Sequence, residues 1–286
     1  MTIVDIFLER VWPLLFRAGC TLILIYLLLP MLAIVPLSFN AEPFFSYPIR
    51  EFSLRWYYDF FHSSEWLLAL KNSLLVAGSV VVLATVLGTL AALGLTLANF
   101  PLKGFIVALL ISPMMVPHII TGVGLFFFFA MFNLVNTLTG LVLAHTLVAT
   151  PFVVMTVSVT LANFNTNLIR AASNLGAGPV VVFRRVILPL ILPGVLSGAL
   201  FAFVASFDEL IIAILMAGSE TRTLPRQMWS GVREEVSPVI TAVATMLMAF
   251  AIIAMLTMEW LRRRGERMRT ARVLVDVPGA QVATPG

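Results

Sequence analysis

Six apolar runs, each about as long as a bilayer core is thick, constrain the fold of this chain more than any other feature. A helix that spans the hydrocarbon core needs roughly 20 mostly apolar residues. The runs that reach this length are Gly19–Phe39, Ser73–Ala98, Phe105–Phe132, Thr137–Leu161, Gly194–Ala217 and Val239–Leu261. Hydrophobic residues make up 60% of the chain and charged residues 11%, against about 45–50% and about 25% in soluble domains. We therefore predict an all-α integral membrane protein with six transmembrane helices.

The first run has an alternative interpretation as a cleaved signal peptide. Its apolar part is longer than the roughly 7–15 residues of such a peptide, and no clear small-x-small site follows it. We therefore expect residues 1–18 to form an N-terminal segment, residues 19–264 the six-helix permease domain, and residues 265–286 a disordered tail.

Lysine and arginine are distributed unevenly between the two sets of connections. One set carries six basic residues together with seven acidic ones, and the other set carries twelve basic residues. The twelve are Arg10, Arg17, Lys103, Arg170, Arg184, Arg185, Arg262, Arg263, Arg264, Arg267, Arg269 and Arg272. Because cytoplasmic loops are enriched in Lys and Arg, we predict that both termini and the connection between the fourth and fifth runs are cytoplasmic.

Several functional classes lack their sequence signatures in this chain. Cys20 is its single cysteine, so we expect neither an internal disulfide nor a Cys/His metal site. The pattern G-x-x-x-x-G-K-[ST] is absent, as are H-E-x-x-H and G-x-S-x-G, so we expect no catalysis by this chain. A pI near 9.7 is compatible with nucleic acid, but the placement of the basic residues favours a membrane face, and we expect no nucleic-acid partner.

Two prolines interrupt the third run, in "ISPMMVPHIITGVG" from Ile111 to Gly124. Pro113 and Pro117 each remove a backbone donor from the helix. We favour a packing kink, and the alternative is a broken helix beside a substrate path.

The connection at about residues 161–193 contains "RAASNLGAGPVVVFRRVILPLILPG", from Arg170 to Gly194. Apolar spacing from Leu168 predicts a short helix, and Gly176 is a natural residue to end it. We expect Pro189 and Pro193 to stop a second amphipathic piece and turn the chain into the fifth span. By itself this pattern is compatible with an interfacial helix that only reverses the chain, and with a surface for another protein.

This segment resembles the EAA loop of permease subunits in binding-protein-dependent ABC importers. The family pattern is E-A-A, three residues, G, nine residues and I-x-L-P, and it corresponds here to Arg170-Ala171-Ala172, Gly176 and Val186–Pro189. The resemblance implies a MetI-like type I importer fold and a coupling helix that docks on an ATPase. The implied coupling residues are Arg170, Ala171, Ala172, Leu175, Gly176, Ala177, Leu188 and Pro189. Arg170 departs from the family, since it stands in place of the glutamate.

The same resemblance implies the partners and the compartment. They are two copies of an ATP-binding subunit, a second permease that is homologous but different, an extracytoplasmic binding protein that docks on loops 40–72 and 218–238, and membrane lipid. The bacterial inner membrane is the implied location. This chain would hold no cofactor, since ATP and Mg would belong to the ATPase.

Within the family, three segments resemble spermidine/putrescine-type permeases: "LAHTLVATPFVV" (143–154), "SFDEL" (206–210) and "LPRQMWSGVREEVSPVITAVATML" (224–247). Asp208 and Glu209 lie inside the fifth run, where an acid costs at least about 2.5–3.5 kcal/mol and usually faces a polar path. We expect Asp208, Glu209, His118 and Phe201 to line the substrate path. The alternative for the acids is an internal cap or a salt bridge, for instance to Arg222 or Arg226.

His118 weakens the polyamine assignment, because polyamine-type permeases typically carry an acid at the matching position. Another organic cation, an amino-acid derivative or an organic anion is therefore an alternative cargo. His118 and His145 can also be neutral residues that pack helices. A secondary transporter is a further alternative, but no repeat is visible in the sequence.

Overall fold

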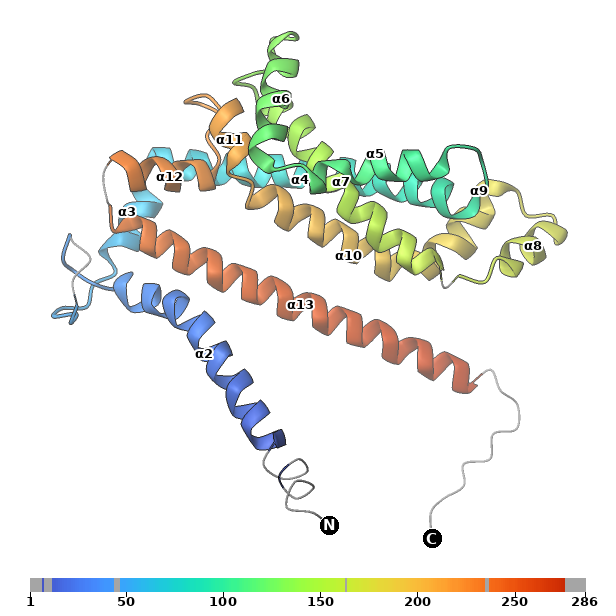
Figure 1. Cartoon of the computed structure of the whole chain (residues 1–286), viewed down its shortest axis with the longest axis horizontal. Coiled ribbons are helices and arrows are strands. Elements are labelled where there is room, and N and C mark those ends of the chain that lie inside the picture. The colour runs from blue at the N-terminus through green and yellow to red at the C-terminus, as the bar shows by residue number, and fades with distance from the viewer. Residues whose placement is uncertain (1–6, 8–11, 44–46, 163, 235–236, 276–286) are drawn as a thin grey trace. The chain divides into compact units, whose positions relative to one another are not determined.

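A computed structural model describes residues 7, 12–43, 47–162, 164–234 and 237–275, with the backbone alone for residues 234 and 258–275. The described chain is helical, with one isolated β-bridge between Asn40 and Phe52. Its helices are α2 (Trp12–Leu37), α3 (Arg55–His62), α4 (Ser64–Leu97), α5 (Lys103–Met115), α6 (His118–Ala130), α7 (Leu138–Ala162), α8 (Asn167–Asn174), α9 (Pro179–Val182), the π-helix η2 (Phe183–Ile187), α10 (Leu188–Phe207), α11 (Ile211–Met216), α12 (Leu224–Glu234) and α13 (Val239–Val275) (Figure 1).

Five helical segments of the described chain are long and apolar enough to cross a membrane, and a bent pair brings the number to six. The five are Trp12–Leu37, Ser64–Leu97, Leu138–Ala162, Pro179–Phe207 and Val239–Thr257, and the pair is α5 with α6. Helices suit these runs because they satisfy every backbone hydrogen bond within the segment, which the hydrocarbon interior requires. The multi-pass helical prediction is confirmed. The predicted orientation of the termini stays a prediction, and Arg10 and residues 276–286 lie outside the described residues.

The chain divides into two compact units, of which the first takes in residues 1–64 and 230–252. Here the indole Nε1 of Trp56 donates to the Asn40 carbonyl at 2.6 Å. The hydroxyls of Ser38 and Tyr57 share a hydrogen bond of 2.7 Å. These bonds connect the residues that follow α2 to the first turn of α3, where Trp56 is buried.

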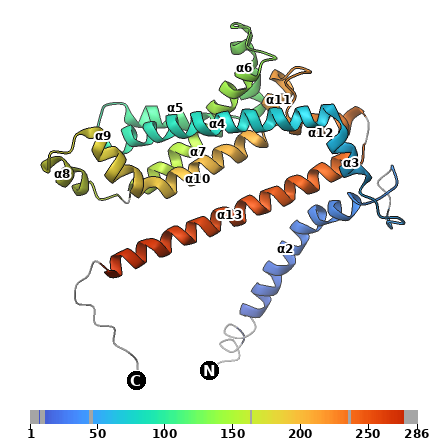
Figure 2. The same ribbon diagram turned by 180° about the vertical axis from the view of Figure 1, so that it is seen from behind.

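The second unit, residues 65–229 and 253–286, holds the main core, in which α7 and α10 pack along their lengths. Figures 1 and 2 show these two helices side by side from both directions. Glycines permit the close approach: a Cβ at Gly198 would lie 3.1 Å from the Val153 Cα, and one at Gly194 would collide with Thr160. The Thr160 hydroxyl donates to the Thr156 carbonyl on its own helix, so the polar group adds no unsatisfied donor to the interface.

The third run is broken and not merely kinked. Between α5 and α6 the axis turns by 105° at Val116 and Pro117, so the expected packing kink is wrong. The cause is local: a residue before proline is pushed out of the α region, and Val116 accordingly has φ −80° and ψ 135°. Pro117 then stands at the N-cap of α6, where its missing N–H costs no helical hydrogen bond.

The fifth run begins earlier than expected, because Pro189 and Pro193 do not stop the helix. Helical structure continues from Pro179 through η2 and α10 to Phe207. Pro189 stands in the first turn of α10, and the wider π turn of η2 precedes it. In a regular α-helix, a proline ring clashes with the carbonyl of the residue four positions earlier. For Pro189 that residue is Arg185, which lies in the π turn, where the helix is wider.

The end of α13 also differs from expectation. The helix continues to Val275, so a disordered tail from residue 265 is wrong for 265–275. This stretch, "GERMRTARVLV", holds no proline and a single glycine, Gly265. Arg, Glu, Met, Ala and Leu favour helix, and Glu266 stands three residues before Arg269, a spacing that supports it.

Candidate functional site

A break in the fifth run brings polar side chains of three helical segments together within the second unit. Residues 208–210 separate α10 from α11. His145 of α7 holds the α10 side of this break, since its Nδ1 lies 3.2 Å from the Ser206 carbonyl oxygen and 3.1 Å from the Ser206 hydroxyl. His145 is 1% exposed, and its contacts are those of a residue that joins two helices.

Glu209 holds the other side of the break, where it caps α11. Its Oε1 accepts hydrogen bonds from the backbone N–H groups of Ile211 at 3.0 Å and Ile212 at 3.1 Å. These are two of the donors that a helix N-terminus leaves unsatisfied, and a carboxylate there also meets the positive end of the helix dipole.

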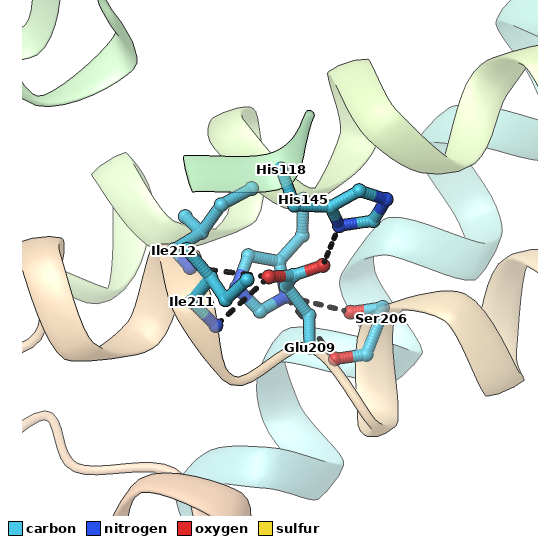
Figure 3. Close-up of polar contacts among 6 residues, drawn as sticks. All are labelled: His118, His145, Ser206, Glu209, Ile211 and Ile212. Atoms are coloured by element: carbon cyan, nitrogen blue, oxygen red, sulfur yellow. Dashed lines mark hydrogen bonds and ion pairs between the residues drawn. The ribbon is translucent and has the colours of Figure 1, made fainter. Parts of the chain in front are cut away.

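The second carboxylate oxygen of Glu209 meets His118. Its Oε2 lies 3.3 Å from the His118 Nδ1 (Figure 3). The Glu209 side chain is 6% exposed and the His118 side chain 49% exposed. The alternative of an internal cap or ion pair thus describes Glu209, but its partner is His118, not Arg222 or Arg226.

Arg226 lies at the opposite end of α11. Its Nη1 donates to the Ala213 carbonyl at 3.3 Å, one of the last four carbonyls of the helix. Burial lowers the pKa of Arg226 from its ordinary value, and the neighbouring charge of Arg222 lowers it further. The helix therefore has a carboxylate at its N-terminus and a guanidinium near its C-terminus, which is the favourable direction for both charges.

Close packing of α6 on α11 brings His118 to Glu209. A Cβ at Gly122 would lie 2.8 Å from the Leu215 Cδ1 and 3.5 Å from the Ile211 Cγ2. The absence of a side chain at Gly122 therefore gives Leu215 and Ile211 room against α6, and His118 stands one turn earlier on α6.

Asp208 and Phe201 lie on a different surface. Phe201 and Val204 of α10 lie on the same face as Asp208, the C-cap residue of this helix, because the three follow the helical spacing of three and four residues. All three are exposed, and the Phe201 ring stacks on Phe152 with 6.5 Å between centroids. Of the four predicted path residues, the structure thus brings His118 and Glu209 into contact and leaves Asp208 and Phe201 on an exposed face.

The predicted coupling helix is α8, and it ends as the pattern indicated. Gly176 has φ +84°, and the N–H groups of Gly176 and Ala177 donate to the carbonyls of Ser173 at 2.9 Å and Ala172 at 3.1 Å. These two bonds form a Schellman motif. The motif leaves Leu175 88% exposed.

The other coupling residues divide between the surface and the core. Arg170 and Ala171 are exposed on α8, whereas Ala172 and Ala177 pack against the core cluster. Leu188 and Pro189 belong to the first turn of α10. The helix α8 packs against α9 and η2, and Figures 1 and 2 place α8 and α9 at one end of the unit.

Two residues that anchor a loop were not singled out from the sequence. The Asn72 amide donates to the carbonyls of Glu220 and Arg222, each at 3.0 Å. The Ser73 hydroxyl accepts from the Leu224 N–H at 2.7 Å. Both side chains are buried in α4, and the sequence signal was an adjacent polar pair at the start of an apolar run. Among the described residues, no group of three His, Cys, Asp or Glu side chains could hold a metal ion.

Comparison with known proteins adds a family, relatives and a fold. A family model described as "Binding-protein-dependent transport system inner membrane component" matches residues 84–267. The spermidine/putrescine transport system permease protein PotC of Escherichia coli (strain K12) is 30% identical over 260 residues, which cover 91% of this chain and 98% of PotC. The putrescine transport system permease protein PotI of the same strain is 32% identical over 251 residues, covering 85% and 89%.

Two solved structures share the fold. One is a bacterial ABC transporter involved in the import of the acidic polysaccharide alginate, with a TM-score of 0.68, 13% identity, and coverage of 92% of this chain and 98% of that one. The other is a bacterial alginate ABC transporter in complex with an alginate pentasaccharide-bound periplasmic protein, with a TM-score of 0.68, 14% identity, and coverage of 91% and 96%.

Proposed function

The chain belongs to the family of binding-protein-dependent transport system inner membrane components, and on this premise we propose that it lines the path of an ATP-driven importer for a small organic cation. It is a non-catalytic permease subunit of an ABC importer and a multi-pass protein of the inner membrane. The proposed partners are two copies of an ATPase that binds ATP and Mg, a second, homologous permease and an extracytoplasmic binding protein.

The exposed end of α8 is the observation that carries this proposal. A leucine side chain in water is unfavourable by about 1.5–3 kcal/mol relative to burial, and Leu175 is held outward by the rigid turn at Gly176. Small residues beside it, Ala171 among them, permit close approach of a partner surface. An ATPase cleft is the partner that the family supplies. Arg170 is exposed on the same helix, so it can meet an acid of that partner.

Support for a cationic cargo comes from the named relatives and from one side chain. PotC and PotI are described as polyamine permeases, whereas the alginate importer shares the fold and imports an acidic polymer. Because one fold serves cargoes of opposite charge, the side chains along the path must determine which charge a permease accepts. Asp208 supplies an exposed carboxylate at the break in the fifth run.

The complex itself provides the first test. We expect affinity-tagged chain, purified from its native membrane in mild detergent, to bring with it an ATPase and a second permease in stable ratio. Proteoliposomes of this complex should take up cargo only when ATP and the binding protein are both supplied. Purification of the chain alone, with uptake that follows an ion gradient, would instead indicate a secondary transporter.

Asp208→Asn is expected to lower uptake of a cationic cargo by about tenfold. A hydrogen bond to a charged group contributes about 1.5–3 kcal/mol, and 1.4 kcal/mol corresponds to a factor of ten. Initial uptake rates in proteoliposomes measure the effect, and the yield of the complex should be unchanged because the side chain is exposed. The control is Glu266→Gln, which removes a carboxylate of α13 beyond the last apolar run and outside the loops assigned to the binding protein. Equal loss of uptake and yield would make Asp208 structural.

A further inference from the structure

Two chain breaks, far apart in the sequence, meet at one pair of side chains. The break in the third run ends at His118, the first residue of α6. The break in the fifth run contains Glu209, 91 residues later, and the Oε2 of Glu209 lies 3.3 Å from the His118 Nδ1. Figure 3 shows this contact beside the one between His145 and Ser206. The pair therefore joins the two breaks directly.

The carboxylate of Glu209 is already engaged on both oxygens. Oε1 accepts the N–H groups of Ile211 and Ile212, and Oε2 meets His118. Only 6% of the Glu209 side chain is exposed. Little of this carboxylate is therefore open to a passing cation.

Asp208, the adjacent acid, differs from Glu209 in its exposure. Its side chain is exposed, it begins the break at the C-cap of α10, and it lies on the face of Phe201 and Val204. An exposed carboxylate is the group that a cation would meet.

We propose that His118 and Glu209 are positioning residues that cross-link the two breaks through their side-chain contact, which leaves Asp208 as the single cargo-facing carboxylate of the 208–210 break. This inference rests on the proposed function and refines its cargo: this break engages one ammonium group at a time. The two neighbouring acids, which look equivalent in the sequence, have different tasks.

Glu209→Gln separates the two tasks. Glutamine keeps an oxygen that accepts from Ile211 and Ile212, and its amide can donate to a neutral His118, so cap and cross-link both survive without charge. With putrescine as the probe and the complete complex in proteoliposomes, we expect Glu209→Gln to change uptake by less than about threefold and Asp208→Asn to lower it by about tenfold. A loss with Glu209→Gln as large as with Asp208→Asn, at unchanged complex yield, would overturn the proposal.

A double-mutant cycle of melting temperatures, here called the melting cycle, tests the pair without reference to cargo. His118→Leu strands a buried carboxylate, and we expect it to lower the Tm of the detergent-solubilised complex by about 2–4 °C. Adding Glu209→Gln should restore most of this loss, because the stranded charge is gone. If the two Tm shifts simply add, the residues are not coupled and the proposal is overturned. If Asp208→Asn leaves uptake unchanged, the cargo role of Asp208 fails, while the melting cycle still decides the pair.

Discussion

Gly88→Val is expected to prevent the chain from folding into a stable complex. A Cβ at Gly88 would lie 2.6 Å from the Cβ of Val153 and 3.3 Å from the backbone oxygen of Thr150. Val153 has no exposed surface, and its other side lies against Gly198 of α10. It therefore cannot move away from α4 without pressing into a third helix.

The expected cost follows from overpacking at a close-packed helix contact. Inserting carbon atoms into a filled core costs about 1–3 kcal/mol, and more where backbone must shift. We expect the yield of the complex in mild detergent to fall by at least about tenfold, since marginal stability leaves little reserve. Fluorescence-detected size-exclusion chromatography measures this yield.

Gly78→Val is the matched control on the same helix. Among the described residues, no heavy atom outside the local backbone of α4 lies within 4 Å of a Cβ at Gly78, and the propensity cost of valine in a helix is the same at both positions. The control should therefore give nearly the yield of the unmodified chain. Normal yield and melting temperature with Gly88→Val would show that α4 and α7 do not pack as closely as described here.

Gly176→Val is expected to uncouple ATP hydrolysis from transport. The φ of +84° at Gly176 is one that side-chain-bearing residues rarely adopt, at a cost of about 1–2 kcal/mol and more for a β-branched residue. The turn that holds Leu175 outward would rearrange, whereas the core of the second unit would not be touched, because no heavy atom of a described residue beyond the chain neighbours lies within 4 Å of a Cβ there.

Two rates measured on the same proteoliposomes test this expectation. ATP hydrolysis should persist, while cargo uptake falls by at least about tenfold and the subunits still co-purify. Gly178→Val is the control, since Gly178 also has open space around it but an ordinary extended backbone at φ −69° and ψ 163°. Unchanged uptake with Gly176→Val, or an equal loss with Gly178→Val, would remove the special role of this turn.

Local signals in the sequence predicted local structure well where one residue type decides it. Gly176 ends α8 because glycine alone adopts the left-handed turn at no cost. The prolines were less informative. Pro117 breaks its run and Pro193 does not, although both remove the same donor. The difference lies in the preceding backbone, which is extended at Val116 and continues helically into Pro193.

The roles of the two acids at the break could not be separated from the sequence. Asp208 and Glu209 are adjacent, similar in chemistry, and equally unexpected in an apolar run. Their exposure differs because α10 ends between Phe207 and Asp208, and that end is held by His145, a residue of another helix.

The sequence by itself determined that the chain crosses a membrane, which apolar runs form its spans, and which loop carries the family pattern. The length of an apolar run and the position of a glycine act within a single segment, so their structural effects can be predicted without knowledge of the fold. Only the tertiary structure decided that Glu209 pairs with His118, because that contact depends on the packing of α6 against α11 at Gly122. Such a contact depends on distance in space, and 91 residues of chain separate these two side chains.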